Sequence, residues 1–562
     1  MSISVLQKRM ARVFLTRKSW LRRCFWVLPL LALTLVPYDT RHEARPTQSH
    51  PCLEDARRLC PDAQAGQGQL LRCLEEHESE LSGVCRERIK VFKEGARRNT
   101  VAAGRNPATT SDSRVPSEPF AVSYQAGKLD AGSNLMGGTE LMNLVAYKGK
   151  LYAGVGYWED ESSNDQTPGA QILVLDSSRD RWRIEHTFSE RLPNGSRRFR
   201  RVTALQVITF ATDGRGRALP QPVSMLIAGL DPFGGGAVFS LDDDTGRWSE
   251  TELPRTSYRA LTLYRDPITG VDRIFAGGAG YEDKSGHRPG GIFSGVYDPS
   301  APGRIRWSET AEFTGFGDRV VAFAECNGHL YFSSKPGICE RTTNGSHPVW
   351  SEIYSYSHPM RLNSSGLRGL TTIPNPNGSG QVILAAAEEA PCVILRIDPA
   401  DDHRVTTELN VDEFLFKHWG RLLVPYVIAA YNSMPIVRDP DSNQSVHIIG
   451  LQAFCPLPGK EHSAWYLIRD ANARYSLHEI RPVPLIPESG QPSHHYLSMV
   501  TNGRPTTERS PNLGAVRTII VSPFASDTGH ALYFGGYDTD GRPAHNTAWL
   551  YRVGLRTALF NE

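Results

Sequence analysis

The sequence carries little net charge and lacks the short motifs that mark nucleic-acid, nucleotide and metal sites. Its 62 basic and 60 acidic side chains leave a formal net charge of +2, so no overall field favours a polyanionic partner, and no DNA- or RNA-binding motif occurs. The glycine run 234–236 precedes neither a lysine nor a predicted helix, which indicates a turn and not a phosphate-binding loop. His494 and His495 have no third ligand at metal-binding spacing. We therefore expect no nucleic-acid partner, no cofactor and no metal site.

Long apolar runs are also scarce, and the one near the N-terminus is short. The run from Cys24 to Tyr38 follows several basic residues, as in an export signal, but a membrane-spanning helix needs about 20 residues. No small-residue cleavage motif follows it. We favour an uncleaved signal-anchor helix within residues 1–40, which contacts the membrane and leaves the rest of the chain in an extracellular, periplasmic or secretory-pathway space. A cleaved signal peptide, with a secreted product, is the alternative, and Arg22-Arg23 also resembles a twin-arginine signal.

Cysteine is rare, with nine in 562 residues. Four of the nine nevertheless lie in one short segment whose sequence predicts helices. These are Cys52, Cys60, Cys73 and Cys85. Four cysteines just after an export signal predict two disulfides in a small helical domain, residues 50–93. The spacing does not decide which cysteines pair. A zinc site is the alternative, but the gap between the first two cysteines is longer than the two to four residues typical of zinc knuckles.

This segment resembles the cysteine-rich repeat of Golgi apparatus protein 1. The matching features are Asp55, Leu59-Cys60, Gly66, Gly68, Cys73-Leu74, His77 and Leu81-Ser82 before Cys85. That family usually carries many tandem copies, whereas this sequence has one, so the resemblance implies the module but not its binding role. Residues 94–119 then offer almost no apolar material to bury and predict a disordered linker.

The rest of the chain, residues 120–562, repeats a pattern of four short β-strands separated by turns. One copy reads as strands at 259–264, 274–278, 291–297 and 304–307. Copies of its second strand begin near residues 151, 225, 329, 382, 446 and 531. With the strand at 274, the shortest intervals between copies are about 50 residues, as in propeller blades, and the other intervals are longer. The pattern predicts a mainly β protein with about seven propeller blades. A short strand at 120–124 is expected to complete the last blade, because pairing the first and last strands closes the ring.

The blades resemble kelch repeats. Gly277-Gly278 ends the second strand of one blade, and Tyr297-Asp298 and Trp307 follow it. Gly535-Gly536 and Trp549 match more loosely in the last blade, and the blades near Ser333 and Ala386 lack the glycine pair. The resemblance implies a propeller fold and no particular activity, since the kelch family includes both scaffolds and enzymes.

Arginine recurs at the start of the predicted innermost strands. The residues are Arg201, Arg259, Arg319, Arg368 and Arg517. Asn143 takes this place in the first blade, and Arg421 is the nearest candidate in the sixth. Side chains at one level of the inner strands would ring one mouth of the axial channel, and guanidinium groups bind carboxylates, sulfates and phosphates through two hydrogen bonds. The alternative is structural, with each arginine paired to a carboxylate or a backbone carbonyl of a neighbouring blade.

The sequence therefore favours a binding module for an acidic glycan or a protein, with the five arginines as ligand-binding residues. A carbohydrate-active enzyme is the second hypothesis. Sialidases also gather arginines in a propeller, but the segment 240–248 resembles their Asp-box turn with one residue too many. Carboxylates follow predicted second strands at Glu159-Asp160 and Glu388-Glu389, but none is singled out as catalytic. A third hypothesis is a purely structural protein. Cys326 and Cys339 are expected either to form a disulfide or to remain buried thiols.

Overall fold

The computed structural model describes part of the chain, in two units that divide between Asp112 and Ser113. In the first unit the described residues are 55, 58–59, 76–83 and 86. In the second they run from 119 to 560 except 158–166, 194, 233–235, 255, 284–285, 289, 316–318, 345–346, 357–365, 389–391, 423–426, 430–433, 484–512, 528–529 and 538–545.

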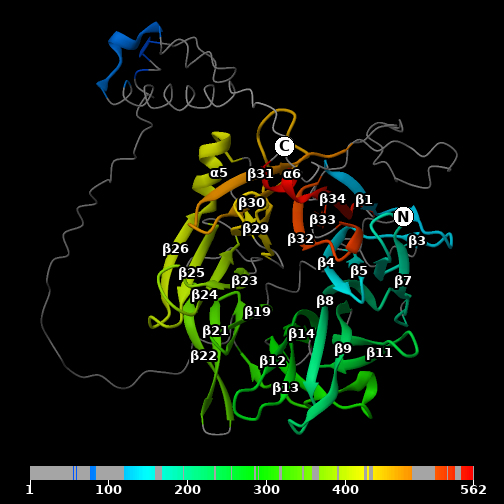
Figure 1. Cartoon of the computed structure of the whole chain (residues 1–562). Coiled ribbons are helices and arrows are strands. Elements are labelled where there is room, and N and C mark those ends of the chain that lie inside the picture. Colours follow the sequence, from blue (N-terminus) through cyan, green and yellow to red (C-terminus); the bar gives the residue numbers. More distant parts are fainter. Residues whose placement is uncertain are drawn as a thin grey trace, which may run out of the picture. The chain divides into compact units, whose positions relative to one another are not determined.

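The second unit is a ring of seven antiparallel blades (Figure 1). Blade 1 contains β4 (Glu140–Tyr147), β5 (Lys150–Gly156), β6 (Ala170–Leu175) and β7 (Arg183–Phe188). Blade 2 contains β8 (Phe199–Thr212), β9 (Ala218–Pro232), β10 (Gly236–Asp242) and β11 (Arg247–Leu253). Blade 3 contains β12 (Thr256–Arg265), β13 (Asp272–Ala279), β16 (Gly291–Tyr297), β17 (Ile305–Trp307) and β18 (Phe313–Thr314). Blades 4 and 5 contain β19 (Val320–Cys326), β20 (His329–Ser334), β21 (Gly337–Asn344) and β22 (His347–Ser355), and β23 (Leu367–Pro374), β24 (Gln381–Ala387), β25 (Val393–Asp398) and β26 (Arg404–Asn410). Blade 6 contains β27 (Ile428–Ala429), β28 (Ile436–Arg438), β29 (Ser445–Gln452), β30 (Ala464–Arg469) and β31 (Tyr475–Ile480), and blade 7 contains β32 (Ala515–Val521), β33 (Ala531–Tyr537), β34 (Trp549–Gly554) and β1 (Ala121–Gln125).

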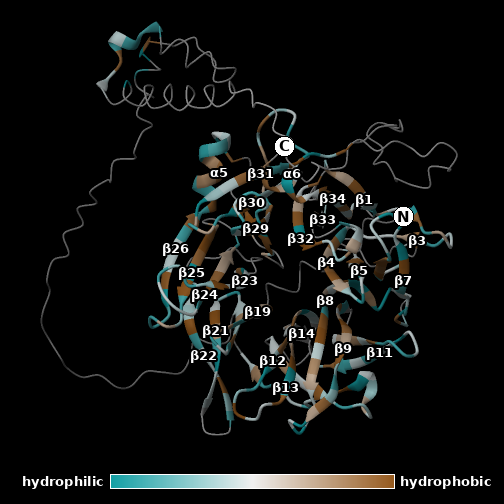
Figure 2. Ribbon diagram, in the orientation of Figure 1, coloured by the Kyte–Doolittle hydropathy of each residue, from teal (hydrophilic) through white to brown (hydrophobic). Residues whose placement is uncertain are grey.

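The observed strands fall where the repeat predicts them, so the mainly β propeller fold is confirmed. The predicted third strand at 291–297 has the same bounds as β16, and the predicted second strands lie within β5, β9, β13, β20, β24, β29 and β33. The second and third strands of the blades carry long hydrophobic runs (Figure 2), because both faces of each blade pack on a neighbouring blade. The likeness of the blades to kelch repeats remains a prediction.

Strand β1 closes the ring as the sequence predicts. It pairs antiparallel with β34, with Val122 opposite Tyr551 and Gln125 opposite Trp549. The last blade is therefore built from both ends of the propeller sequence, and a strand that would otherwise form an open edge is covered. A further bridge from Tyr537 to Glu140 joins blade 7 to blade 1.

The glycines that end the second strands are explained by contact with the next blade. A Cβ atom on Gly156 would lie 2.2 Å from Cα of Arg201, and one on Gly229 would lie 2.3 Å from the carbonyl oxygen of Tyr258. Gly277 faces Val320 in the same way, at 2.4 Å. The repeated glycines therefore let the second strand of one blade approach the inner strand of the following blade.

We expect Gly156→Ala to destabilise the propeller by about 1–3 kcal/mol, as overpacking of a filled core does. The added methyl group would meet the Arg201 backbone, which cannot rotate away as a side chain can. Gly378→Ala is the matched control, because its nearest atom, Nδ2 of Asn375, lies 4.0 Å from the added carbon, and it should change stability by less than about 0.5 kcal/mol. Denaturant unfolding of both variants tests this, and equal stabilities would contradict the proposed role of Gly156.

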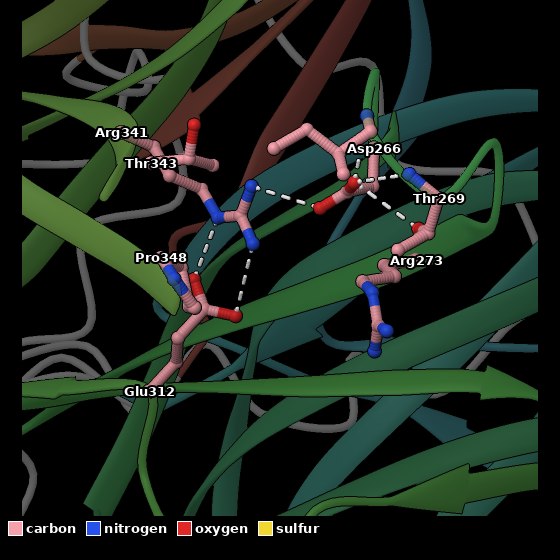
Figure 3. A pocket seen from close by; sticks show the side chains of 8 residues that line it. Asp266, Thr269, Arg273, Glu312, Arg341, Thr343 and Pro348 are labelled. Atoms are coloured by element: carbon pink, nitrogen blue, oxygen red, sulfur yellow. Dashed lines mark hydrogen bonds and ion pairs between the residues drawn. The ribbon is translucent and has the colours of Figure 1, made fainter. Parts of the chain in front are cut away.

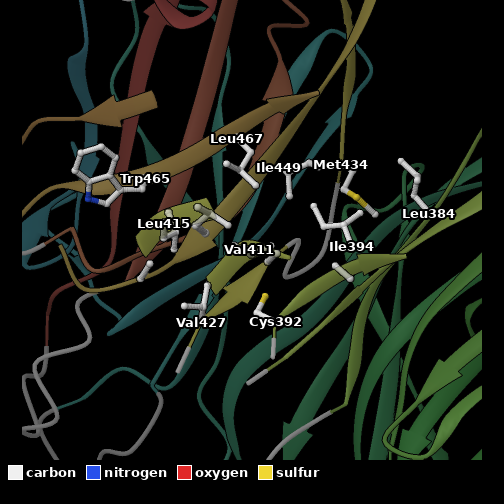
Figure 4. Close-up of a cluster of buried hydrophobic side chains, with 14 of the residues drawn as sticks. Leu384, Cys392, Ile394, Val411, Leu415, Val427, Met434, Ile449, Trp465 and Leu467 are labelled. Carbon is white, nitrogen blue, oxygen red and sulfur yellow. The ribbon is translucent and has the colours of Figure 1, made fainter. Parts of the chain in front are cut away.

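Helix α5 (Val411–Trp419) links blades 5 and 6. The side chain of Asn410 accepts a hydrogen bond from the backbone N–H of Glu413 and so caps its first turn, and Gly420 ends it with a φ of 76°. Its apolar face joins a buried cluster that draws on both blades (Figure 4). Arg421, the nearest candidate that the sequence offered for the sixth inner strand, is exposed just after the helix and does not begin a strand.

In the first unit, Asp55 forms several hydrogen bonds with other described residues. Its carboxylate accepts hydrogen bonds from the backbone N–H and the hydroxyl of Ser82, and from Arg58. The predicted signal-anchor within 1–40, the disulfides of Cys52, Cys60, Cys73 and Cys85, and the linker before residue 119 lie outside the described residues. Within the part of the chain that the structure describes, no helix is both long and apolar enough to cross a membrane.

The four cysteines of the propeller are buried free thiols, namely Cys326, Cys339, Cys392 and Cys455. Of the two alternatives for Cys326 and Cys339, the structure therefore has the thiols and not the disulfide. Burial raises the pKa of each of these two thiols to about 12, so neither is a reactive thiolate at neutral pH.

Candidate functional site

The five predicted arginines meet where the inner strands begin and the second strands end. The inner strands β4, β8, β12, β19, β23 and β32 lie nearest the centre of the ring (Figure 1). Three carboxylates join the arginines there. We call this group the axial cluster, and it comprises Glu140, Arg201, Asp231, Arg259, Arg319, Arg368, Glu388 and Arg517.

The arginines occupy two register positions and not the single level that the sequence predicts. Arg201 bridges to Gly156 of the preceding blade, and Arg319 bridges to Ala279 in the same way. The other three arginines, Arg259, Arg368 and Arg517, lie further along their strands, where the pairing register shifts. A β-bulge inserts an unpaired residue and turns its side chain. The bulges therefore bring arginines from different register positions into one cluster.

The first blade contributes a carboxylate in place of an arginine. Glu140 bridges to Tyr537 of blade 7 as Arg201 bridges to blade 1, so Glu140 occupies the equivalent position. The prediction that Asn143 takes this place is wrong, because Asn143 pairs with Gly154, beyond a bulge in β4.

Glu140 connects three blades through its two oxygens. Oε1 accepts a hydrogen bond of 2.6 Å from Nη1 of Arg201, and Oε2 accepts one of 2.8 Å from Nη2 of Arg517. Its side chain is completely buried. Burial alone would raise the pKa of Glu140, but Arg517 and Arg201 outweigh it and hold the pKa below its ordinary value. Glu140 is therefore ionised at neutral pH.

The other two carboxylates serve Arg201 and Arg368. Asp231 accepts a hydrogen bond of 2.8 Å from Nε of Arg201 and also lies 3.4 Å from Arg200. Burial opposes ionisation of Asp231, but Arg201 and Arg200 hold its pKa below the ordinary value. The carboxylate of Glu388 accepts hydrogen bonds from Nε and Nη2 of Arg368, at 2.6 and 3.1 Å. The structural hypothesis therefore describes Arg201, Arg368 and Arg517 well, because each is paired with a buried carboxylate.

Arg259 differs from these three. Its only hydrogen bond among the described residues runs from Nε to the hydroxyl of Ser257, at 3.3 Å, and no described carboxylate lies within ion-pair distance of it. Desolvation and repulsion from Arg319 and Arg201 lower the pKa of Arg259 well below its ordinary value. The pKa of Arg319 falls to about 10, because desolvation and repulsion from Arg368 and Arg201 disfavour its charge. Both residues are of intermediate exposure and not fully buried.

These contacts determine the chemistry that the axial cluster can perform. Among the described residues it places five arginines beside three carboxylates, of which Glu140 and Asp231 are held ionised, and guanidinium groups of this kind can bind anions. No group of three histidine, cysteine or acidic side chains among the described residues has a metal-binding arrangement. Tyr537, which donates a 2.6 Å hydrogen bond to Gln452, lies under Arg517, whose guanidinium is 4.4 Å from the ring centre.

A hollow of about 250 Å³ lies at the seam of blades 3 and 4 (Figure 3). Arg341 of blade 4 reaches across it to Glu312 at 2.7 Å and to Asp266 at 3.2 Å. Trp350 donates a hydrogen bond to the same Glu312. Arg341 therefore forms ion pairs with both carboxylates, and these pairs hold blades 3 and 4 together at the hollow. Arg273 also lines it and makes no ion pair with a described residue.

The fold and the cluster define a seven-bladed β-propeller with an arginine-rich axial site. No protein-family model and no curated protein matches the chain. Among solved structures it is similar to the extracellular domain of a putative hybrid two-component system from B. thetaiotaomicron, at 11% identity and a TM-score of 0.39, covering 77% of this chain and 39% of that one. It is also similar to the periplasmic gluconolactonase of Pseudomonas aeruginosa, at 13% identity, a TM-score of 0.37, and 74% and 96% coverage. The sialidase of Trypanosoma rangeli is 9% identical, with a TM-score of 0.33 and 79% and 60% coverage.

Proposed function

We propose that the protein is an exported binding module whose axial cluster takes an anionic ligand, such as an acidic glycan or an acidic segment of a protein. The observation that supports this most directly is the state of Arg259, which is desolvated, partly exposed and without a carboxylate partner among the described residues. An anion there would supply the hydrogen bonds and the negative charge that the cluster itself does not provide.

The state of the carboxylates favours binding over hydrolysis. A glycosidase that protonates its leaving group needs a carboxyl group with a raised pKa. In the axial cluster the pKa values of Glu140 and Asp231 are both lowered, and Glu388 forms a two-pronged ion pair with Arg368. Glu140 and Asp231 therefore stay ionised at neutral pH, and all three carboxylates bind arginines.

We expect Arg259→Gln to weaken binding of acidic glycans by about tenfold to a hundredfold, the value of one or two charged hydrogen bonds. The measurement is titration calorimetry against a panel of acidic and neutral glycans at low and high salt. Arg273→Gln is the matched control, because Arg273 is also partly buried, lies in the same blade and makes no ion pair with a described residue. It sits six residues from the cluster end of β13, or about 20 Å along the strand. Equal losses in the two variants would contradict a specific role for Arg259.

A carbohydrate-active enzyme is the competing proposal, and turnover separates it from a binding module. Incubation of the chain with sialosides and with neutral glycosides should leave them intact. Release of a sugar by the chain, abolished in Asp231→Asn while the ligand still binds, would favour the enzyme, because Asp231 is one of the carboxylates of the axial cluster and has two arginines within ion-pair distance.

We propose that the propeller lies outside the cytoplasm, as the N-terminal sequence predicts. Export by a signal-anchor within residues 1–40, or by a cleaved signal, would place the propeller outside, where Cys52, Cys60, Cys73 and Cys85 could form disulfides. The kelch-like and Golgi apparatus protein 1-like resemblances belong to this proposal. Mass spectrometry of the mature chain, with and without reduction, tests both the cleavage and the two disulfides.

A further inference from the structure

Arg273 brings an unused positive charge to the hollow at the seam of blades 3 and 4. It lies on β13 two residues before Phe275, so the two side chains share one face of the strand. The guanidinium carbon of Arg341 lies 5.4 Å from the ring centre of Phe275, on that same face. The neighbouring Asp272 pairs instead with Arg265 and with the backbone of blade 2. The side chain of Arg273 makes no hydrogen bond or ion pair with a described residue, so its N–H donors remain available to a ligand.

Another part of the lining carries a net negative charge. Asp266 and Glu312 share one guanidinium group, that of Arg341, at 3.2 and 2.7 Å. Burial opposes ionisation of Asp266, but hydrogen bonds from Thr269 and the charge of Arg341 hold its pKa below the ordinary value. Two carboxylates on one cation leave one negative charge over. Oε2 of Glu312 receives only a long hydrogen bond of 3.4 Å, from Arg341, so it can accept another donor.

The two charges of the hollow are separated and of opposite sign. In Figure 3 the guanidinium group of Arg273 and the carboxylate of Glu312 lie on opposite sides of the hollow, and no hydrogen bond joins them. A ligand with a single charge would match only one of them. The volume of about 250 Å³ lies below the roughly 300–1,000 Å³ of pockets that hold drug-sized molecules. Pro348 and the exposed Ile268 add apolar surface to the lining. The hollow is therefore complementary to a small zwitterion with an apolar part.

We infer that this hollow binds a free α-amino acid with a small apolar side chain, of the size of valine. The carboxylate of the amino acid accepts two hydrogen bonds from the guanidinium fork of Arg273, and its ammonium group donates to Oε2 of Glu312. The apolar side chain then lies against Pro348 and Ile268. This inference goes beyond the proposed function, because the described lining of the hollow shares no residue with the axial cluster.

The test is calorimetric titration of the full chain with L-valine, L-valinamide and N-acetyl-L-valine at one ionic strength. The amide lacks the carboxylate and the acetyl derivative lacks the ammonium group, so each should bind at least about tenfold more weakly than valine. Arg273→Gln should weaken valine binding by at least about tenfold as well. Arg247→Gln is the matched control and should leave valine binding unchanged. Arg247 is an exposed strand residue that makes no ion pair with a described residue and does not line the hollow.

The three ligands and two variants give distinct outcomes. Absence of valine binding, or valine binding that Arg273→Gln weakens no more than Arg247→Gln does, would overturn the site. Equal affinity for valine and N-acetyl-valine would overturn the zwitterion in favour of a simple anion at Arg273. Equal affinity for valine and valinamide would overturn it in favour of a cation at Glu312. Circular dichroism of each variant shows that a loss of binding is not a loss of fold.

Discussion

Glu140→Gln is expected to lower the free energy of unfolding by about 3–5 kcal/mol, the usual cost of breaking a buried ion pair from one side. Glutamine has the shape of glutamate but cannot carry the charge that Arg201 and Arg517 face. Both guanidinium groups are almost completely buried, so water cannot replace the lost partner. Because Glu140 links blades 7, 1 and 2, the substitution should weaken the contact between the first and last blades, where the ring closes. Urea or guanidinium unfolding, followed by tryptophan fluorescence, measures the effect.

Glu252→Gln is the control for Glu140→Gln. Glu252 also pairs with an arginine, Arg198, but its side chain is 78% exposed, and such pairs contribute about 0–1 kcal/mol. A loss at Glu140 no larger than that at Glu252 would show that the axial ion pairs do not support the fold.

Acid titration gives a second readout for Glu140. Its folded-state pKa lies below the ordinary value, so its contribution to stability is present above the unfolded-state pKa near 4 and is lost as the pH falls through the folded-state value. The wild-type chain should therefore lose stability more steeply below about pH 4 than Glu140→Gln does.

Tyr124→Ala is expected to destabilise the propeller by about 3–5 kcal/mol, as truncation of a buried aromatic side chain does. Tyr124 belongs to β1, the strand that completes blade 7 from the N-terminal side. Its ring packs edge-on against Trp182 of blade 1, and its hydroxyl donates a hydrogen bond to the carbonyl of Gly137. Loss of the ring would weaken both the pairing of β1 with β34 and the contact between first and last blades. Thermal and denaturant unfolding measure the loss.

Two further variants show which part of Tyr124 is responsible. Tyr124→Phe keeps the ring and removes one hydrogen bond, so it should cost about 1 kcal/mol. Lys128→Ala changes an exposed side chain on β2 (Lys128–Leu129) and should have almost no effect. If Tyr124→Ala unfolds no more easily than Lys128→Ala, the N-terminal strand does not hold the ring closed.

The strands of the propeller could be predicted from the sequence because their signals are local. Alternating and continuous apolar runs, bounded by glycine, proline and aspartate, place most second and third strands to within about two residues. The exceptions include β9, which starts at Ala218, well before the predicted run at 225. The closing strand was predictable too, because a propeller that ends on an incomplete blade needs another strand to cover its edge. The sixth inner strand was missed because helix α5 and the short strands β27 and β28 interrupt the pattern.

The axial site was predictable only in part. The five arginines stand out because they recur before inner strands, and the structure brings all five into one cluster. Their partners could not be identified, since Glu140, Asp231 and Glu388 come from different strands and are far apart in sequence from several of the arginines that they bind. Bulges in the inner strands also shift the register by an amount that a count of residues does not reveal.

Local chemistry in the sequence determined that this chain forms repeated four-stranded units, with glycines at the ends of second strands and arginines at the starts of inner strands. Only the tertiary structure decided what these residues do. Gly156 is small because the next blade's backbone lies against it. Arg201 and Arg517 share Glu140 of the blade between them, and Arg368 pairs with Glu388 at the end of the neighbouring strand of its own blade. The physical reason is that burial and charge pairing depend on which strands and blades become neighbours, and among the described residues the same packing gives Arg259 a single hydrogen bond, to Ser257.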